Sequence, residues 1–190
     1  MQPKDFGFGE DEAMLRDSAR KFLSDTLPVD KLRQLVAADH VEAYESATPP
    51  LKYDENIWKR IVDLGWTALA VPEEAGGVGM KMVAVAALAE EAGRVALPSP
   101  LIPTLITTCV LREAGTAAAG KALARIVGGE AASMATTDAQ GSWEPGDTDV
   151  VAENARGATK LSGTAYFVQD ARKANFFVVA AKSDAGVGLY

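Results

Sequence analysis

Side chains able to do polar chemistry gather in one stretch of the chain, from Ser133 to Ser142, with the sequence SMATTDAQGS. A run of hydroxyl groups leads there into a Gly-Ser turn. Hydroxyls and turn N–H groups can bind a polar ring or a phosphate, because they offer several donors at close spacing. An ordinary strand and turn is the alternative, so the stretch is a candidate binding site that needs support from elsewhere in the chain.

A second candidate approaches a phosphate-binding loop, with the pattern Gly115-x4-Gly120-Lys121-Ala122. The match fails because Ala122 has no hydroxyl for a magnesium ion, and because the residues before it have a helical pattern rather than that of a strand. We interpret this segment as the junction between two helices.

Residues that could ligate a metal or transfer a proton are few or badly placed. His40 is the only histidine and Cys109 the only cysteine, so we expect neither a metal site nor a disulfide. The polar surroundings of His40 indicate surface, and the apolar ones of Cys109 indicate core. The pairs Glu73-Glu74 and Glu90-Glu91 are expected to be solvated, since adjacent helical positions do not face each other.

The bulk composition narrows the class of protein. The chain has 190 residues, 48% of them hydrophobic, and a net charge of −7. This composition supports a buried core and argues against nucleic-acid binding, which needs clustered Lys and Arg. The N-terminal residues lack the apolar segment of a signal peptide, and no uncharged apolar run is long enough to cross a membrane. We therefore expect a cytoplasmic protein without a membrane span.

Helical periodicity extends to about residue 129. Helices are predicted over 10–26, 29–38, 54–64, 80–93, 100–114 and 116–127, with Asp54 as an N-cap and a loop over 45–53. The helix over 80–93 is apolar nearly all round, and the one over 100–114 is also apolar, which predicts burial.

The pattern changes from Glu130 onward. Strands are predicted over 131–137, 149–153, 159–168, 175–181 and 188–190. The predicted class is therefore α+β, with an all-α helical bundle over 1–129 followed by a partial antiparallel β domain over 130–190. So few strands leave exposed edges, and we expect the chain to stop inside this second domain.

A glycine-rich corner connects the helices predicted over 54–64 and 80–93, with the sequence LGWTALAVPEEAGGVG over 64–79. Proline fixes φ and glycine tolerates positive φ, so this is a shaped turn rather than a loose linker. The corner, the N-terminal amphipathic helix, the Glu90-Glu91-Ala92-Gly93-Arg94 helix end and the change to strands at 130 occur in order. Together they resemble the acyl-CoA dehydrogenase family across nearly the whole chain.

The resemblance implies an FAD site built from two segments. The family pattern A-L-T-E-P-x-A-G-S-D corresponds to the segment ending at Trp143: Thr136, Gly141 and Ser142 match, whereas Thr137, Asp138 and Trp143 replace Glu, Pro and Asp. The pattern G-x-K-x-W-I-T-N falls on 163–170, with Phe167 for the Trp and Gln169 for the Thr. The implied cofactor-binding residues are Ser133, Met134, Thr136, Gly141, Ser142, Phe167, Val168 and Gln169.

The roles of these residues also follow from the resemblance. Thr136 would hydrogen-bond the flavin ring, and Phe167 would pack beside it. Gln169 would reach its polar edge, and Ser142 would lie near the cofactor phosphates and the acyl-CoA substrate. The helices within 80–115 would border the acyl pocket.

The family reaction is α,β-dehydrogenation of an acyl-CoA thioester of the fatty or steroid-derived type, as in fatty-acid β-oxidation. Its glutamate base comes from a C-terminal helical domain, so no catalytic residue is predicted within 1–190. The implied partners are an acyl-CoA substrate, an electron-transfer acceptor protein and further subunits in a homo- or hetero-oligomeric dimer or tetramer. The alternative is a partner subunit in a mixed assembly, with a decayed flavin site and a binding or structural role.

Overall fold

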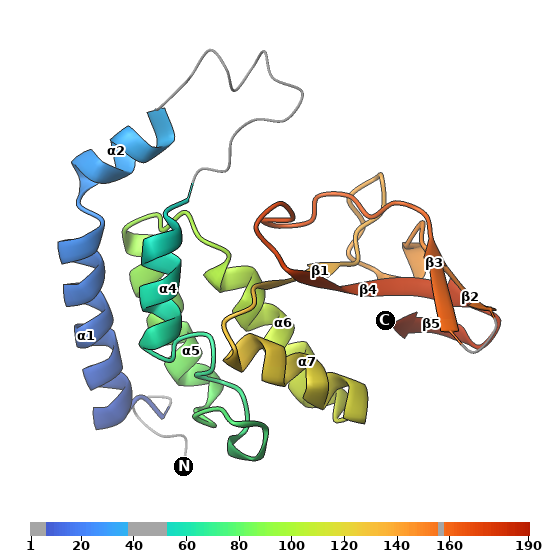
Figure 1. Ribbon diagram of the computed structural model, residues 1–190, viewed down its shortest axis with the longest axis horizontal. Coiled ribbons are helices and arrows are strands. Elements are labelled where there is room, and N and C mark those ends of the chain that lie inside the picture. The colour runs from blue at the N-terminus through green and yellow to red at the C-terminus, as the bar shows by residue number, and fades with distance from the viewer. Residues whose placement is uncertain (1–6, 38–52, 156–157) are drawn as a thin grey trace.

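The computed structural model describes residues 7–37, 53–155 and 158–190. Helices occupy the chain as far as residue 127, and strands follow from residue 132. Figure 1 shows the helices side by side in one half of the molecule and the sheet in the other. The predicted α+β class is confirmed, whereas the division into two domains at residue 129 stays a prediction.

The first helices lie close to their predicted positions: α1 (Glu10–Thr26), α2 (Val29–Ala37) and α4 (Glu55–Asp63). The carboxylate of Asp54 accepts hydrogen bonds from the N–H groups of Asn56 (2.9 Å) and Ile57 (3.3 Å), so Asp54 is the N-cap of α4 as predicted. His40 and most of the predicted loop over 45–53 lie outside the described residues.

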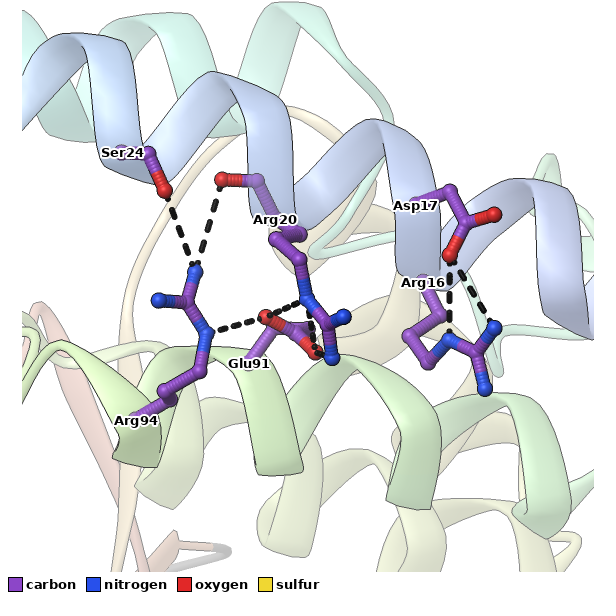
Figure 2. Close-up of polar contacts among 6 residues, drawn as sticks. All are labelled: Arg16, Asp17, Arg20, Ser24, Glu91 and Arg94. Carbon is purple, nitrogen blue, oxygen red and sulfur yellow. Dashed lines mark hydrogen bonds and ion pairs between the residues drawn. The ribbon is translucent and has the colours of Figure 1, made fainter.

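The helical core forms where α5 (Met82–Arg94) packs along α1 and beside α4. Fully or almost fully buried side chains from four helices meet there, together with the corner residue Trp66: Leu23, Ile61, Leu88 and Leu105. The prediction of solvated glutamates is confirmed for Glu90 but wrong for Glu91, which is buried between Arg20 and Arg94 (Figure 2).

The remaining helices, α6 (Leu101–Ala114) and α7 (Ala117–Val127), pack against the strands over 132–135 and 176–183. Leu111, Leu123 and Ile126 pack there against Ala132 and Val178 of the strands. Gly115 ends α6 in the left-handed conformation and the Thr116 hydroxyl caps α7, so the segment resembling a phosphate loop is a helix junction, as interpreted.

The glycine-rich corner folds back on itself around Pro72 and the short helix η1 (Glu73–Ala75). The N–H of Val78 donates to the carbonyl of Ala68 (3.1 Å), and the N–H of Gly79 donates to that of Val71 (2.8 Å). A Cβ at Gly77 would overlap the Val71 carbonyl, so only glycine fits there.

The sheet contains β1 (Ala132–Ala135), β2 (Val151–Ala155), β3 (Ala158–Ser162), β4 (Phe176–Ser183) and β5 (Gly186–Leu189), and η2 (Pro145–Asp147) precedes β2. The strand order is β1-β4-β2-β3, with β5 also pairing β4. β2–β3 and β4–β5 are antiparallel, but β1–β4 and β2–β4 are parallel. The sheet is therefore mixed rather than purely antiparallel.

Two predicted strands are shorter in the structure than in the sequence pattern. The strand predicted over 159–168 ends at Ser162, because Gly163 turns the chain at φ +135° where a Cβ would overlap the Asp149 carbonyl. The strand predicted over 131–137 ends at Ala135, and Thr137 makes only an isolated bridge to Tyr166. The connection between β3 and β4 is thus irregular and returns along the sheet (Figure 1).

Among the described residues, no helix combines the length and apolar character needed to cross a membrane. The same part of the chain holds no cluster of three or more His, Cys, Asp or Glu side chains suited to a metal ion.

Candidate functional site

A pocket of about 310 Å³ lies beside β1, where three separate parts of the chain meet. One wall comes from β1 and the turn after it, a second from the connection between β3 and β4, and a third from α6. The lining residues are Pro103, Ile106, Ser133, Met134, Thr136, Thr137, Gly141, Trp143, Phe167 and Gln169.

The first wall is shaped by a turn that Asp138 holds together. Its buried carboxylate accepts hydrogen bonds from the N–H groups of Gln140 (3.0 Å) and Ser142 (2.8 Å). An aspartate that binds the backbone two residues on is a common turn former. The turn places Thr136, Gly141 and the indole of Trp143 around the pocket, and Trp143 is 86% exposed.

The second wall is the segment that carries Phe167 and Gln169. Tyr166 N–H donates to the Thr137 carbonyl (2.9 Å), and the Ser133 hydroxyl donates to the Gln169 carbonyl (2.7 Å). These two contacts fix the segment beside β1. The ring of Phe167 is 75% exposed, and its Cε2 would lie 3.9 Å from a Cβ at Gly141, so the two walls approach each other closely.

The third wall is apolar and comes from α6. Pro103 and Ile106 are three positions apart and therefore lie on one helix face. Ile106 is 48% exposed at the pocket, whereas its neighbour Leu105 is 2% exposed in the core. α6 thus contributes both to the core and to the pocket.

Six of the eight residues predicted for a cofactor site line this pocket: Ser133, Met134, Thr136, Gly141, Phe167 and Gln169. Two others lie elsewhere. The Ser142 hydroxyl donates to the Asp147 carboxylate at 2.6 Å. Val168 lines a separate apolar hollow of about 300 Å³ with Val150 and Phe177.

Four lining residues were not predicted for the site: Thr137, Trp143, Pro103 and Ile106. Thr137 and Trp143 occupy positions of the family pattern where Glu and Asp are expected. Because these side chains do not match the pattern, the sequence did not predict that they line the site. The i, i+3 spacing of Pro103 and Ile106 was a signal for a shared face, but only the tertiary packing shows that this face meets the pocket.

The lining residues that the structure describes carry no carboxylate, imidazole or amine, so they offer hydrogen bonds and apolar contact rather than acid–base groups. Aromatic faces at Phe167 and Trp143, aliphatic contact from α6, and hydroxyl or amide groups at Thr136, Thr137 and Gln169 suit a flat ring with a polar edge. A flavin ring has these properties, and the residues present fit it.

Comparison with known proteins places the chain in a family. The model of the acyl-CoA dehydrogenase N-terminal domain matches residues 9–130, well over half of the chain. The chain belongs to the acyl-CoA dehydrogenase family. The corner and the Glu90–Arg94 helix end lie within the matched residues.

Individual relatives of this chain agree with the family match. "Acyl-CoA dehydrogenase IpdE2" of Mycobacterium tuberculosis is 29% identical over 106 residues, which cover 55% of this chain and 30% of that protein. A variant of the "Tcur3481-Tcur3483 steroid ACAD" superposes with a TM-score of 0.79 at 29% identity, over 96% of this chain and 47% of its own.

A third relative, a Bacillus anthracis acyl-CoA dehydrogenase solved in complex with FAD, shares the fold with a TM-score of 0.71 at 22% identity. The match covers 100% of this chain and 31% of its own. In all three comparisons, the chain spans less than half the length of its relative.

Proposed function

We propose that this chain supplies one wall of the flavin site in an FAD-dependent acyl-CoA dehydrogenase, and that the protein containing it dehydrogenates an acyl-CoA thioester between its α and β carbons. The observation that carries the proposal is the pocket beside β1. Residues from two segments expected to bind flavin converge on it, and its lining has the aromatic, apolar and hydrogen-bonding character of a flavin ring site.

The chain's own residues would hold and shield the cofactor. Thr136 would hydrogen-bond the polar edge of the ring, with Gln169 beside it, and Phe167 would pack along the ring. Ile106 of α6 would exclude water from one side, which strengthens polar interactions inside the site. The bound FAD would supply the hydride acceptor, since cofactors carry such chemistry while the protein orients and polarises.

The substrate and partners are proposed on the same basis. The "Tcur3481-Tcur3483 steroid ACAD" among the relatives supports a steroid-derived acyl group as substrate, and a fatty acyl group is the other candidate. An electron-transfer protein would reoxidise the flavin, and a homo- or hetero-oligomer would be the working assembly. We assign residues 1–129 to the helical domain and 130–190 to the β domain that carries most of the pocket.

The test uses the protein as the whole reading frame encodes it. After gel filtration, we expect FAD to remain bound, and its visible absorbance to bleach on anaerobic addition of the correct acyl-CoA. Thr136→Val should weaken FAD binding about threefold to tenfold, the effect of one lost hydrogen bond. Thr164→Val is the matched control, since Thr164 is exposed and outside the pocket lining.

The contrary result would be a protein that binds no FAD and shows no bleaching with any acyl-CoA. It would favour the alternative of a partner subunit with a binding or structural role, in which Thr137, Asp138 and Trp143 mark a site no longer used for flavin.

A further inference from the structure

The segment 166–169 lies along the outer edge of β1, where no strand of the described residues pairs with it. β1 stands at one end of the sheet order, and in the part of the chain that the structure describes it pairs with β4 alone. The Tyr166 bridge to Thr137 anchors the start of the segment. The Ser133 hydroxyl reaches the Gln169 carbonyl at its end, at 2.7 Å. This side-chain contact joins the middle of β1 to the segment.

The backbone is strained within this segment and directly after it. Phe167 has φ +53° and Asp170, the residue that follows the segment, has φ +49°; this left-handed conformation is uncommon for residues with a side chain and unusual for a bulky aromatic. Such conformations persist where surrounding contacts over-determine them, and they gather at ligand sites. Asp170 is supported locally, because its carboxylate pairs with Lys173 at 2.6 Å and its carbonyl accepts the N–H groups of Lys173 and Ala174.

Phe167 depends on support from its two sides, through Tyr166 and Gln169. The Ser133 side chain is 1% exposed, so its hydrogen bond is shielded from water. A serine hydroxyl has one proton to donate, and here it goes to the Gln169 carbonyl. Ser133 therefore keeps only acceptor capacity for a ligand.

We propose that Ser133 is a positioning residue: its hydroxyl locks the segment 166–169 against β1 and so presents Phe167 and Gln169 to the pocket. The inference rests on the proposed function and refines it. It gives the two residues different roles: Ser133 acts indirectly, through Gln169, whereas Thr136 would touch the cofactor. A segment that is already fixed in the free protein does not lose conformational entropy when the ligand binds, so binding is tighter than with a mobile segment.

The experiment compares Ser133→Ala with Thr148→Ala in the protein encoded by the whole reading frame. Thr148 is a matched control, because it is also 1% exposed and its hydroxyl donates to a backbone carbonyl, that of Ala180 at 2.9 Å, outside the pocket lining. The first readout is amide hydrogen exchange, measured by mass spectrometry on peptides covering 163–175. The second is FAD affinity, and the third is the unfolding midpoint in urea.

We expect exchange over 163–175 to be about tenfold faster in Ser133→Ala and unchanged in Thr148→Ala, because only the first variant releases the segment. FAD affinity should fall severalfold in Ser133→Ala alone, although both variants lower the unfolding midpoint. Unchanged exchange in Ser133→Ala, or equal acceleration in both variants, would overturn the proposal.

A released segment with unchanged FAD affinity would also overturn it, since the segment would then not be preset for the ligand. The two proposals fail separately. Wild-type protein without any FAD binding would contradict the proposed function, whereas faster local exchange in Ser133→Ala alone would still support the locking role.

Discussion

The buried carboxylate of Glu91 forms an ion pair with the half-exposed guanidinium of Arg20, between helices that are distant in sequence. Arg20 Nη2 lies 2.6 Å from Glu91 Oε1, and the fully buried carboxylate also accepts from Arg94 Nε at 2.7 Å (Figure 2). Arg94 in turn contacts Ser24 and the carbonyl of Arg20. The cluster therefore ties α1 to α5 at a point where an uncompensated carboxylate would be costly.

Replacing Glu91 should destabilise the protein. Glu91→Gln removes the charge that both guanidinium groups bind, and we expect a loss of about 1–2 kcal/mol in the free energy of unfolding. The loss is moderate because the side chains of Arg20 and Arg94 are 50% and 40% exposed and can regain water. Urea unfolding measures it. Glu90→Gln is the control, since Glu90 is exposed, and an equal loss there would contradict the assignment.

The same pair predicts a pH dependence. The hydrogen bond from Arg20 lowers the pKa of Glu91 below its ordinary 4.5, and Arg94 lowers it further, although burial opposes both. A carboxyl group whose pKa is depressed by folding stabilises the protein above the unfolded pKa, and this stabilisation is lost as the pH falls through the folded pKa. The stability gap between wild type and Glu91→Gln should therefore narrow below about pH 4.5.

Urea unfolding at several pH values tests this prediction. Asp54 and Glu130 also have lowered pKa values: at Asp54, Lys31 and two backbone N–H groups outweigh burial, and at Glu130 the main cause is Arg125. Both remain in the variant, so the difference between the two proteins isolates Glu91. A gap that stays constant down to acid pH would show that the ion pair does not stabilise the fold.

Gly77 should be intolerant of any side chain. A Cβ there would overlap the carbonyl of Val71, inside the corner that returns the chain to α5. We expect Gly77→Ala to cost about 2–3 kcal/mol, as overpacking of a rigid site does. Gly93→Ala is the control within α5, where nothing lies within 4 Å of the added Cβ, and it should stabilise by about 0.5–1 kcal/mol. If thermal unfolding shows the same change in stability for both variants, the backbone of the corner can shift to accommodate the added Cβ.

Substitutions at two adjacent residues of α6 should have different effects, because one side chain lies in the core and the other lines the pocket. Leu105→Ala should cost about 2–5 kcal/mol, because Leu105 is 2% exposed in the helical core. Ile106→Ala should stay within about 0.5 kcal/mol of wild type, because Ile106 is 48% exposed. It should instead weaken FAD binding. A Leu105→Ala loss below about 0.5 kcal/mol would mean that this face of α6 is not core.

The sequence could predict those site residues that lie in short motifs, but not those whose position depends on tertiary packing. Thr136, Gly141 and Phe167 lie in short motifs whose order survives, so they could be predicted. Val168 lies in the same motif but lines the other hollow, and the sequence could not predict this because the left-handed turn at Phe167 is a feature of the folded backbone. The resemblance placed the helix over 100–114 at the acyl pocket, but which of its residues lines the pocket could not be predicted, because that depends on how α6 packs.

The same distinction applies to the fold. Asp54 and Gly115 mark the ends of helices through their own chemistry, and both positions agreed with the structure. Glu91 continues the buried stripe of Ala84 and Leu88 at helical spacing, a signal that the paired carboxylates concealed. The parallel pairing of β1 with β4 joins strands about 40 residues apart and has no local signature.

Dehydrogenation by residues 1–190 alone would need a base at the pocket. Removal of an α-proton needs a base within hydrogen-bond reach of the substrate carbon, held opposite the flavin. Two acidic groups in the segments that form the pocket are committed elsewhere: the Asp138 carboxylate holds its own turn, and Asp170 pairs with Lys173. In the part of the chain that the structure describes, no acidic residue lines the pocket. The residues that stay outside the lining include Glu73, Glu74, Glu90, Glu91, Asp138 and Asp170.

We therefore expect no acyl-CoA dehydrogenation by residues 1–190, even with added FAD, an artificial electron acceptor and acyl-CoA thioesters of several chain types. The positive control is the protein encoded by the whole reading frame, assayed in parallel. We expect activity there if that protein supplies a correctly oriented base, because orientation contributes heavily to rate. Turnover above background by residues 1–190 that Asp138→Asn or Asp170→Asn abolishes would place the base within this chain. Such a result would overturn both the assignment of the base to a region outside these residues and the purely binding role of the pocket.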